Sequence, residues 1–488
     1  MVKNKFYVTT PIYYVNSEPH IGSAYTTILA DVFARWHRLK EENVFFLTGT
    51  DEHGQKIQQI AKENKTEPKE FVDKIAKKFQ ETFKLLNISN DFFIRTTNPK
   101  HDEEVSKILQ ELYDKKFIYK GEYEALYCVG CEQYLNKSDL VDGKCPLHKK
   151  EPEIIKEEAY MFKLSAFQDK LLKLIETGEF EILPMKRRNE VVSFLKTGLQ
   201  DISISRKKEK VSWGIELPFD KNHSCYVWIE ALLNYVTGLK INNKFKDYWP
   251  CDLQLMANDI LRIHATIWPA LLLALKYKLP KTLYIHGYFT VNGQKMSKSL
   301  GNAVSPVYLA EKYGVDAIRY FLIREIPFGD DGDFNENALK ERLNNELANE
   351  LGNLVSRTLN LVEKFGEVKK EKQELKFEIS NIDKLILDLK INQALNEIWR
   401  LVQDCNRYVN EKKPWELNGK EKEIVLYNLL EGLRIVSILL YPFIPETCEK
   451  INKQLGIKNG NLKECEFGLI KSYKSKKGEI LFRKIENK

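Results

Sequence analysis

The chain has 488 residues, 30% of them charged and 43% hydrophobic, with a formal net charge of +7. This composition excludes a disordered chain, and at roughly 100–200 residues per domain it predicts two to four folded domains. The mildly basic charge allows a polyanionic partner without requiring one, and eight cysteines in so long a chain exclude a disulfide-built scaffold.

The N-terminal part of the chain predicts a strand–helix–strand unit. Residues 6–10 have a strand pattern, residues 23–40 carry apolar side chains at helical spacing, and residues 44–47 form a second short apolar run. Strands that alternate with helices indicate a parallel sheet with helices on both faces. No basic start is followed by an apolar stretch, and the apolar runs 267–275 and 435–444 are shorter than the ~20 residues of a membrane helix. We therefore expect a cytoplasmic protein with no membrane contact.

The pattern changes twice further along the chain. Residues 111–195 form short, lysine-rich segments, which indicates an insertion. Strands of a parallel sheet are expected again at 224–229, 253–256 and 282–285. Residues 334–451 have an almost continuous helical pattern, interrupted at Pro414 and Pro442, and a basic tail with weak strand signals follows.

Three cysteines and one histidine in the insertion have the spacing of a zinc site. Two residues separate Cys128 from Cys131, and two separate Cys145 from His148. Three thiolates and an imidazole make a closed tetrahedral site without an open position for catalysis, so we predict one structural Zn²⁺. The alternative is coincidence. The other five cysteines have no ligand spacing and are expected to be structural.

Two segments are candidates for binding a nucleotide, because the chain has neither of the common glycine-rich phosphate motifs. In the turn 19–23, which opens a helix, His20 can donate to a phosphate and Gly22 lets a base approach the backbone. In the loop 292–302, Lys295 and Lys298 lie between glycines and can meet a triphosphate. Each signal is weak alone, since such a turn is usually only a turn and a lysine pair is usually a solvated loop.

Together these segments resemble the HIGH and KMSKS signatures of class I aminoacyl-tRNA synthetases. Four segments are similar to the methionyl-tRNA synthetase family, in its short bacterial type with a single zinc knuckle: TTPIYY at 9–14, TGTDEHG at 48–54, YVW at 226–228 and KMSKSLGN at 295–302. The resemblance extends from Phe6 to about residue 450. It implies a Rossmann-type α/β catalytic domain with a small zinc-containing insertion, followed by an all-α helical-bundle anticodon-binding domain. It also implies a methionine–tRNA ligase, which activates L-methionine with Mg²⁺-bound ATP and transfers it to the 3′ end of tRNA(Met) for translation initiation and elongation.

The resemblance divides the chain into six parts. They are the first half of the catalytic domain (1–110), the connective insertion with the zinc knuckle (111–195), the second half of the catalytic domain (196–280), a stem-contact region with the KMSKS loop (281–348), the anticodon-binding bundle (349–460) and the C-terminal tail (461–488). A dimerising, tRNA-binding domain found in some relatives is absent from this sequence, so we expect a monomer.

Site residues are also implied by the resemblance. The catalytic residues would be His20, Lys295 and Lys298. The ATP site would be formed by His20, Gly22, Ser23, Lys295, Ser297 and Lys298. The methionine site would be formed by Ile12, Tyr14, Asp51, Trp228, Ala231, Leu232, Tyr235, Ile260 and His264. The anticodon contacts would be Asn353, Arg357 and Trp415.

Simpler interpretations remain open for these residues. Asp51 has the residue type of a helix N-cap, and aromatic residues at helical spacing are more often core. Asn353 and Arg357 share a helix face that solvent could cover, and Trp415 is equally suited to a core indole.

Three positions near the expected active site depart from the family pattern. Ser23 stands for a second histidine, Glu230 for an aspartate, and Ala257–Asn258 for Gly-Lys. Because serine reaches less far than histidine, Ser23→His is expected to speed adenylate formation if the serine hydroxyl meets no phosphate. The alternative is that the local packing has adapted to serine. Another class I synthetase and a non-catalytic tRNA-binding paralogue remain as other functions, although the short insertion leaves little room for an editing domain and Lys295 and Lys298 argue for catalysis.

Overall fold

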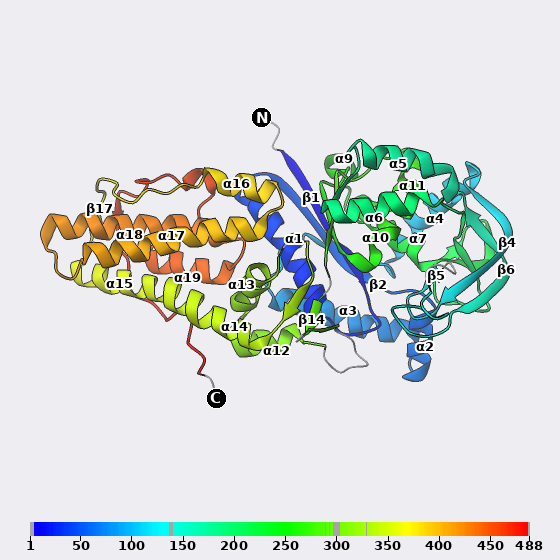
Figure 1. Cartoon of the computed structure of the whole chain (residues 1–488), viewed down its shortest axis with the longest axis horizontal. Helices are drawn as coiled ribbons and strands as arrows, with labels where there is room; N and C mark the ends of the chain where they lie inside the picture. The colour runs from blue at the N-terminus through cyan, green and yellow to red at the C-terminus, as the bar shows by residue number, and fades with distance from the viewer. Residues whose placement is uncertain are drawn as a thin grey trace.

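A computed structural model describes residues 4–135, 140–287, 289–291, 293–295, 303–327 and 329–486. The molecule is elongated, with a sheet in the middle, the inserted strands at one end and a helical bundle at the other (Figure 1). Among the described residues, no helix is long and apolar enough to cross a membrane.

The central sheet has six parallel strands in the order β3-β2-β1-β12-β13-β7. These strands are β1 (Lys5–Tyr14), β2 (Asn43–Asp51), β3 (Phe92–Arg95), β7 (Glu181–Leu183), β12 (Leu253–Ala257) and β13 (Thr282–His286). The predicted Rossmann-type sheet is confirmed. The strand order reverses between β1 and β12, and open α/β sheets bind ligands beyond the carboxyl ends of their strands at such a point.

Helices cover both faces of the sheet, as predicted. Side chains alternate between the two faces along each strand, so each strand contributes to a core on either side. Phe6 and Val8 of β1 enter one core, and Tyr7 enters the other. The first core also contains α1 (Ile21–Leu39), α12 (Pro306–Tyr313) and α13 (Val315–Glu325). The second contains α4 (Pro99–Asp114), α7 (Val227–Leu232), α8 (Asn234–Ile241), α10 (Leu261–Ala265) and α11 (Ile267–Ala274). A small third core holds α2 (Gln55–Glu63) and α3 (Pro68–Leu85).

The inserted region forms an antiparallel sheet in the order β5-β4-β6-β8. Its strands are β4 (Ile118–Cys128), β5 (Gln133–Leu135), β6 (Glu153–Phe162) and β8 (Ile202–Ser203). The helices α5 (Gln168–Glu176) and α6 (Met185–Lys196) follow, on either side of β7. Because β7 belongs to the central sheet, the interval 111–195 contributes to both sheets, and the six-part division of the chain stays a prediction.

The expectation of a parallel strand at 224–229 is wrong. β11 (Asp220–Cys225) pairs antiparallel with β9 (Ser205–Lys207) and β10 (Glu216–Leu217), and α7 begins only two residues after β11 ends. The apolar run crosses this boundary, and a short run buried on all sides has no periodicity that separates strand from helix. The strands expected at 253–256 and 282–285 are confirmed as β12 and β13.

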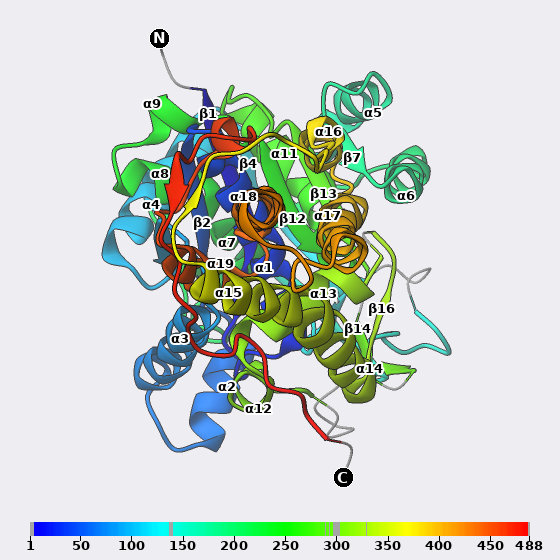
Figure 2. The ribbon, with the colours of Figure 1, turned by 90° about the vertical axis from the view of Figure 1, so that its left-hand side faces the viewer.

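The C-terminal region is helical and is interrupted at the two predicted prolines, but a further interruption between α15 and α16, at 366–379, was not expected. A long helical rod comprises α14 (Glu336–Arg342), a π-helical segment (Leu343–Gly352) and α15 (Asn353–Phe365); α16 (Ser380–Leu387), α17 (Ile391–Lys412), α18 (Gly419–Leu440) and α19 (Pro445–Leu455) follow. Figure 2 looks nearly along the axes of α17 and α18. Short strands β14 (Phe289–Val291), β15 (Gln294–Lys295) and β16 (Gly332–Phe334) form one small sheet, and β17 (Val368–Lys369) pairs with β18 (Ser472–Tyr473).

The bundle is anchored to the catalytic half by a buried arginine. Arg319 of α13 donates to Asp31 of α1 at 2.6 Å and to the carbonyl oxygen of Pro442, after α18, at 2.8 Å. Arg319 is fully buried, so these partners satisfy a charge that would otherwise be costly. One face of the central sheet and the helical bundle therefore share one continuous core.

Candidate active site at the carboxyl edge of the central sheet

The turn that follows β1 is held by reciprocal hydrogen bonds at the start of α1. The Nδ1 atom of His20 accepts from the Gly22 N–H at 3.1 Å. The Ser23 hydroxyl accepts from the His20 N–H at 3.1 Å and donates to the His20 carbonyl oxygen at 2.7 Å. Because Nδ1 is an acceptor, Nε2 carries the proton of the neutral His20 ring. Ser23 is only 5% exposed, and its hydroxyl acts as part of the helix cap.

The residues that follow the second signature segment contact this turn. The Ile21 N–H donates to the carbonyl oxygen of Val304 at 3.0 Å. Lys295 ends β15, where it pairs with Thr290 of β14. Ser297 and Lys298, predicted to contact ATP, lie outside the described residues. The structure thus shows that the chain directly after the second segment contacts the first turn of α1.

Asp51 ends β2 as a buried carboxylate that lacks a full set of partners. It is 6% exposed, and within the described ranges its Oδ1 atom makes no hydrogen bond. Burial, and then the charges of Glu230, Glu132 and Glu52, raises its pKa well above the ordinary range. The N-cap interpretation is not supported, because Gly54 is the N-cap of the next helix. A site of this kind is suited to a cationic ligand group.

Two of the predicted pocket residues form a buried hydrogen-bonded pair. The Tyr235 hydroxyl lies 2.8 Å from Nε2 of His264, and Nδ1 of His264 lies 3.0 Å from the Ile260 carbonyl oxygen. Because a carbonyl only accepts, Nδ1 is the donor and Nε2 accepts from Tyr235. Burial lowers the pKa of His264 to about 4, so the ring is neutral at neutral pH.

The other predicted pocket residues lie on neighbouring elements. Ile12, Trp228 and Ile260 are partly buried against the second core, and Ala231 and Leu232 are buried on α7. The hydroxyl of Tyr14 and the indole Nε1 of Trp228 are buried without hydrogen-bond partners in the part of the chain that is described. Apolar walls with a few unpaired polar atoms are typical of a small-molecule pocket.

The two departures from the family pattern other than Ser23 also have a structural setting. The Glu230 carboxylate lies 2.8 and 3.0 Å from Nδ1 of His53, and both side chains are buried. Burial acts to lower the pKa of His53, but the charge of Glu230 and its hydrogen bond outweigh it and raise that pKa. Asn258 follows β12, and its buried Oδ1 has no partner among the residues described.

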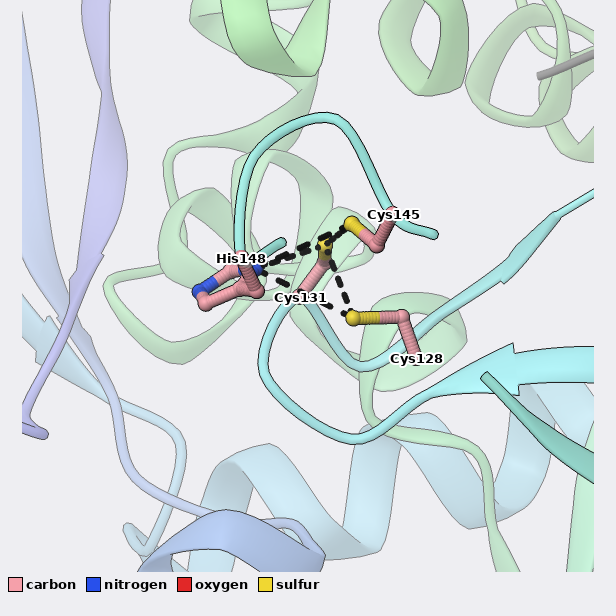
Figure 3. A group of neighbouring side chains, drawn as sticks. All are labelled: Cys128, Cys131, Cys145 and His148. Atoms are coloured by element: carbon pink, nitrogen blue, oxygen red, sulfur yellow. Dashed lines mark hydrogen bonds between the residues drawn. The ribbon is translucent and has the colours of Figure 1, made fainter. Parts of the chain in front are cut away.

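The four predicted zinc ligands converge beside the inserted sheet, at the end of β4 and on the loops that follow it (Figure 3). The ligand atoms of Cys128, Cys131, Cys145 and His148 all lie within 4.8 Å of one another. The Sγ atom of Cys131 is 3.4 Å from that of Cys128, 3.5 Å from that of Cys145 and 3.2 Å from Nδ1 of His148. Ligands about 2.3 Å from a tetrahedral centre have separations of this order. The cluster therefore fits one structural zinc ion.

The three predicted anticodon residues occur at one side of the bundle. Asn353 and Arg357 lie on α15, and the Arg357 guanidinium lies over the ring of Trp415 at 5.6 Å. Trp415 is 49% exposed, so its interpretation as a core indole is wrong. An exposed ring beside a cation is a surface on which a nucleic-acid base can stack.

One buried residue near the pocket was missed from the sequence. Glu132 directly follows a zinc-ligand cysteine and is 3% exposed. Its Oε1 atom accepts from the backbone N–H of Lys56 at 2.7 Å, at the start of α2. An acid next to Cys131 was the only signal, and acids in such loops are usually solvated.

Comparisons with known proteins agree with this geometry. Residues 6–151 and 130–359 match the model described as tRNA synthetases class I (M), and residues 372–483 match an anticodon-binding domain of tRNA ligase. The chain is 47% identical to a methionine–tRNA ligase of Caldanaerobacter subterraneus, over 99% of this chain and 80% of the relative. It is 41% identical to that of Bacillus subtilis, over 99% of this chain and 78% of the relative. Among solved structures, it is similar to the Mycobacterium tuberculosis methionyl-tRNA synthetase in complex with methionyl-adenylate, with a TM-score of 0.92, 36% identity and coverage of 98% and 99% of the two chains.

Proposed function

The chain belongs to the class I tRNA synthetases of the methionine type, and from this premise we propose which of its residues carry the activity. It is a methionine–tRNA ligase, an ATP-dependent enzyme that activates methionine and joins it to tRNA. The observation that carries our assignment of the site is the buried Asp51 carboxylate at the carboxyl end of β2, next to β1, whose Oδ1 atom makes no hydrogen bond within the described ranges.

Asp51 binds the ammonium group of methionine, because a buried carboxylate is stabilised by a cation. The side chain of methionine lies against Ile12, Tyr14 and Trp228, with Ala231, Leu232, Tyr235, Ile260 and His264 as the remaining wall. A thioether is a weak acceptor that packs well against rings, and neutral His264 adds no charge to the pocket.

The first step needs positioning and positive charge rather than a general base, since the methionine carboxylate is already ionised. One of its oxygens attacks the α-phosphorus of Mg²⁺-bound ATP, the new acyl–phosphate bond forms, and the bond to pyrophosphate breaks. His20, with a proton on Nε2, and the cations Lys295 and Lys298 stabilise the leaving charge. Gly22, Ser23 and Ser297 complete the ATP site.

The second step joins the methionyl group to the 3′ ribose of tRNA(Met) and releases AMP. The anticodon is bound far from this chemistry by Asn353 and Arg357 of α15 and by Trp415 in the connection between α17 and α18, within the helical bundle. Zinc bound at the cluster stabilises the loops beside the small inserted sheet. We further propose that the enzyme works as a monomer in the cytoplasm.

Amino-acid-dependent exchange of pyrophosphate into ATP tests this assignment. Methionine should stimulate exchange, and Asp51→Ala should weaken that response. Equal stimulation by leucine or cysteine contradicts the methionine pocket. If no amino acid stimulates exchange, the protein is a non-catalytic tRNA-binding protein.

A further inference from the structure

Glu132 is held rigidly although it lies in the loop of the zinc cluster. It follows Cys131 with a backbone φ of +51°, and it is almost completely buried. Its carbonyl oxygen accepts from the hydroxyl of Tyr226, two residues before the pocket tryptophan Trp228. The backbone of the cluster loop is therefore tied to the strand–helix junction that presents the pocket.

The Glu132 carboxylate also contacts the loop that follows Asp51. Oε1 accepts from the Lys56 N–H at 2.7 Å, and the Lys56 ammonium donates to the Gly130 carbonyl oxygen at 2.9 Å. A Cβ atom on Gly54 would lie only 2.3 Å from Oε2 of Glu132, and Gly54 has a φ of +108°. Glycine is thus required at this position both for its conformation and for the close approach of the carboxylate.

The second carboxylate oxygen of Glu132 and the Tyr14 hydroxyl are complementary. Oε2 of Glu132 and the hydroxyl of Tyr14 are both buried and act on each other as acceptor and donor, although neither makes a hydrogen bond of normal geometry in the described ranges. Burial, and then the charges of Glu132 and Asp51, raises the pKa of Tyr14 well above its ordinary range. A buried hydroxyl and a buried carboxylate oxygen each cost free energy while they lack a hydrogen bond, and a hydrogen bond between them offsets both costs.

We propose that Glu132 is a positioning residue of the amino-acid pocket: its Oε2 atom accepts from the Tyr14 hydroxyl when methionine is bound, while Oε1 holds the first turn of α2. The Tyr14 ring is then fixed against the substrate, and the loop after Asp51 keeps its course. This inference rests on the proposed methionine site. It assigns a role in substrate affinity to a residue of the metal-cluster loop that does not itself ligate the metal.

Glu132→Gln isolates the contact with Tyr14. Glutamine keeps the size of the side chain and an oxygen for the Lys56 N–H, but its amide nitrogen cannot accept from a hydroxyl. Methionine binding is measured by equilibrium dialysis without ATP, and the KM values for methionine and ATP by pyrophosphate exchange. Glu132→Gln and Tyr14→Phe should each weaken methionine binding by about tenfold, with the ATP KM almost unchanged. The double variant should bind methionine no more weakly than the weaker-binding single variant, because both substitutions remove the same hydrogen bond.

Controls separate this inference from a structural effect and from failure of the methionine assignment. Glu151→Gln, an exposed acid of the same insertion, should bind methionine like the wild type, and Glu132→Gln should keep its full zinc content. Loss of zinc from Glu132→Gln, unchanged methionine affinity, or multiplying effects in the double variant would each overturn the proposal. If wild-type exchange does not depend on methionine, the proposed function fails instead.

Discussion

The guanidinium carbon of Arg357 lies 5.6 Å from the centre of the Trp415 ring, and the same guanidinium donates to Asn410 of α17 at 3.0 Å. Arg357 therefore bridges two helices and holds an exposed ring in a fixed orientation. A ring held in this way loses little conformational entropy when a base stacks on it. Substitutions on the side of the bundle near Trp415 therefore test how the protein recognises tRNA.

Trp415→Ala should impair aminoacylation and leave methionine-dependent pyrophosphate exchange intact, because the two activities use opposite ends of the molecule. A lost base stack costs ~1–3 kcal/mol, which corresponds to roughly 5- to 150-fold in the KM for tRNA. Leu387→Ala, at a side chain with 48% exposure at the end of α16, is the matched control. A parallel fall of both activities in Trp415→Ala would mean that the ring stabilises the bundle rather than binding RNA.

Asp51→Ala should raise the KM for methionine and slow adenylate formation. A buried ammonium that loses its carboxylate costs about 3–5 kcal/mol, which is more than about a hundredfold in affinity. The KM for ATP should change far less, and Glu63→Ala, at an exposed acid at the end of α2, should behave like the wild type. Steady-state exchange at varied methionine and ATP concentrations measures the two effects separately. A rise in the ATP KM alone would assign Asp51 to the nucleotide instead.

Methionine affinity should increase with pH in the free enzyme. Burial raises the pKa of Asp51 in the folded protein, so its carboxyl group stays neutral above the ordinary carboxyl range. Protonation of this carboxyl therefore stabilises the folded protein, and that stabilisation is lost as pH rises through the raised pKa. The methionine ammonium favours the ionised form, and binding below the raised pKa must release a proton. Titration calorimetry in buffers of different ionisation enthalpy should detect this release. Asp51→Asn should abolish it; an unchanged release in that variant points to another group.

The zinc cluster should contain one equivalent of metal per chain. Cys131 lies closest to the other ligands, so Cys131→Ser should retain far less zinc, whereas Cys465→Ser, outside the cluster, should retain all of it. Removal of zinc by a chelator should speed hydrogen exchange in β4 and β6, because metal binding and folding of such small sheets are coupled. Full protection of these strands in metal-free protein would show that the inserted sheet is stable without the ion.

Local patterns explain which parts of the fold and site were predictable. β1, α1 and β2 follow one another directly along the chain, so their hydrophobic spacing predicts a strand–helix–strand unit. The zinc ligands lie within one loop region, so their spacing alone predicts the metal site. The three-residue strand β7 carries too little pattern to be found. Its place at the edge of the central sheet depends on pairing with β13, far along the chain.

Contacts between distant residues explain what was missed. Glu132 is buried because Lys56 and Tyr226 meet it from two other segments, and no spacing in the sequence reports that meeting. Likewise Glu230 reads as a departure from the family pattern until the fold places it against His53. Polar burial of this kind is set by tertiary packing, which residue type and periodicity do not encode.

The structural setting of Ser23 argues against the expectation that Ser23→His speeds adenylate formation. A histidine there was expected to add a phosphate donor and speed adenylate formation. In the structure the serine hydroxyl makes two hydrogen bonds to the backbone of His20, and the side chain is buried. Its backbone oxygen also accepts from the hydroxyls of Tyr13 and Thr27. The packing around position 23 is therefore adapted to serine, which favours the alternative stated above.

Ser23→His should accordingly slow adenylate formation and lower the thermal stability of the protein. Ser23 is 5% exposed, so the larger imidazole must displace its neighbours, and the lost cap costs about 0.5–2 kcal/mol. Because the cap fixes the backbone of His20, its loss also displaces the ring that stabilises the leaving phosphate, and a misplacement of this kind lowers the rate more than the methionine affinity. Ser23→Ala removes the cap without the bulk, so it should slow the step less than Ser23→His. Single-turnover adenylation of the three proteins, with thermal unfolding in parallel, ranks these effects. A Ser23→His enzyme that is faster than the wild type would show that the turn rearranges around ATP and that the serine hydroxyl leaves its cap when the nucleotide binds.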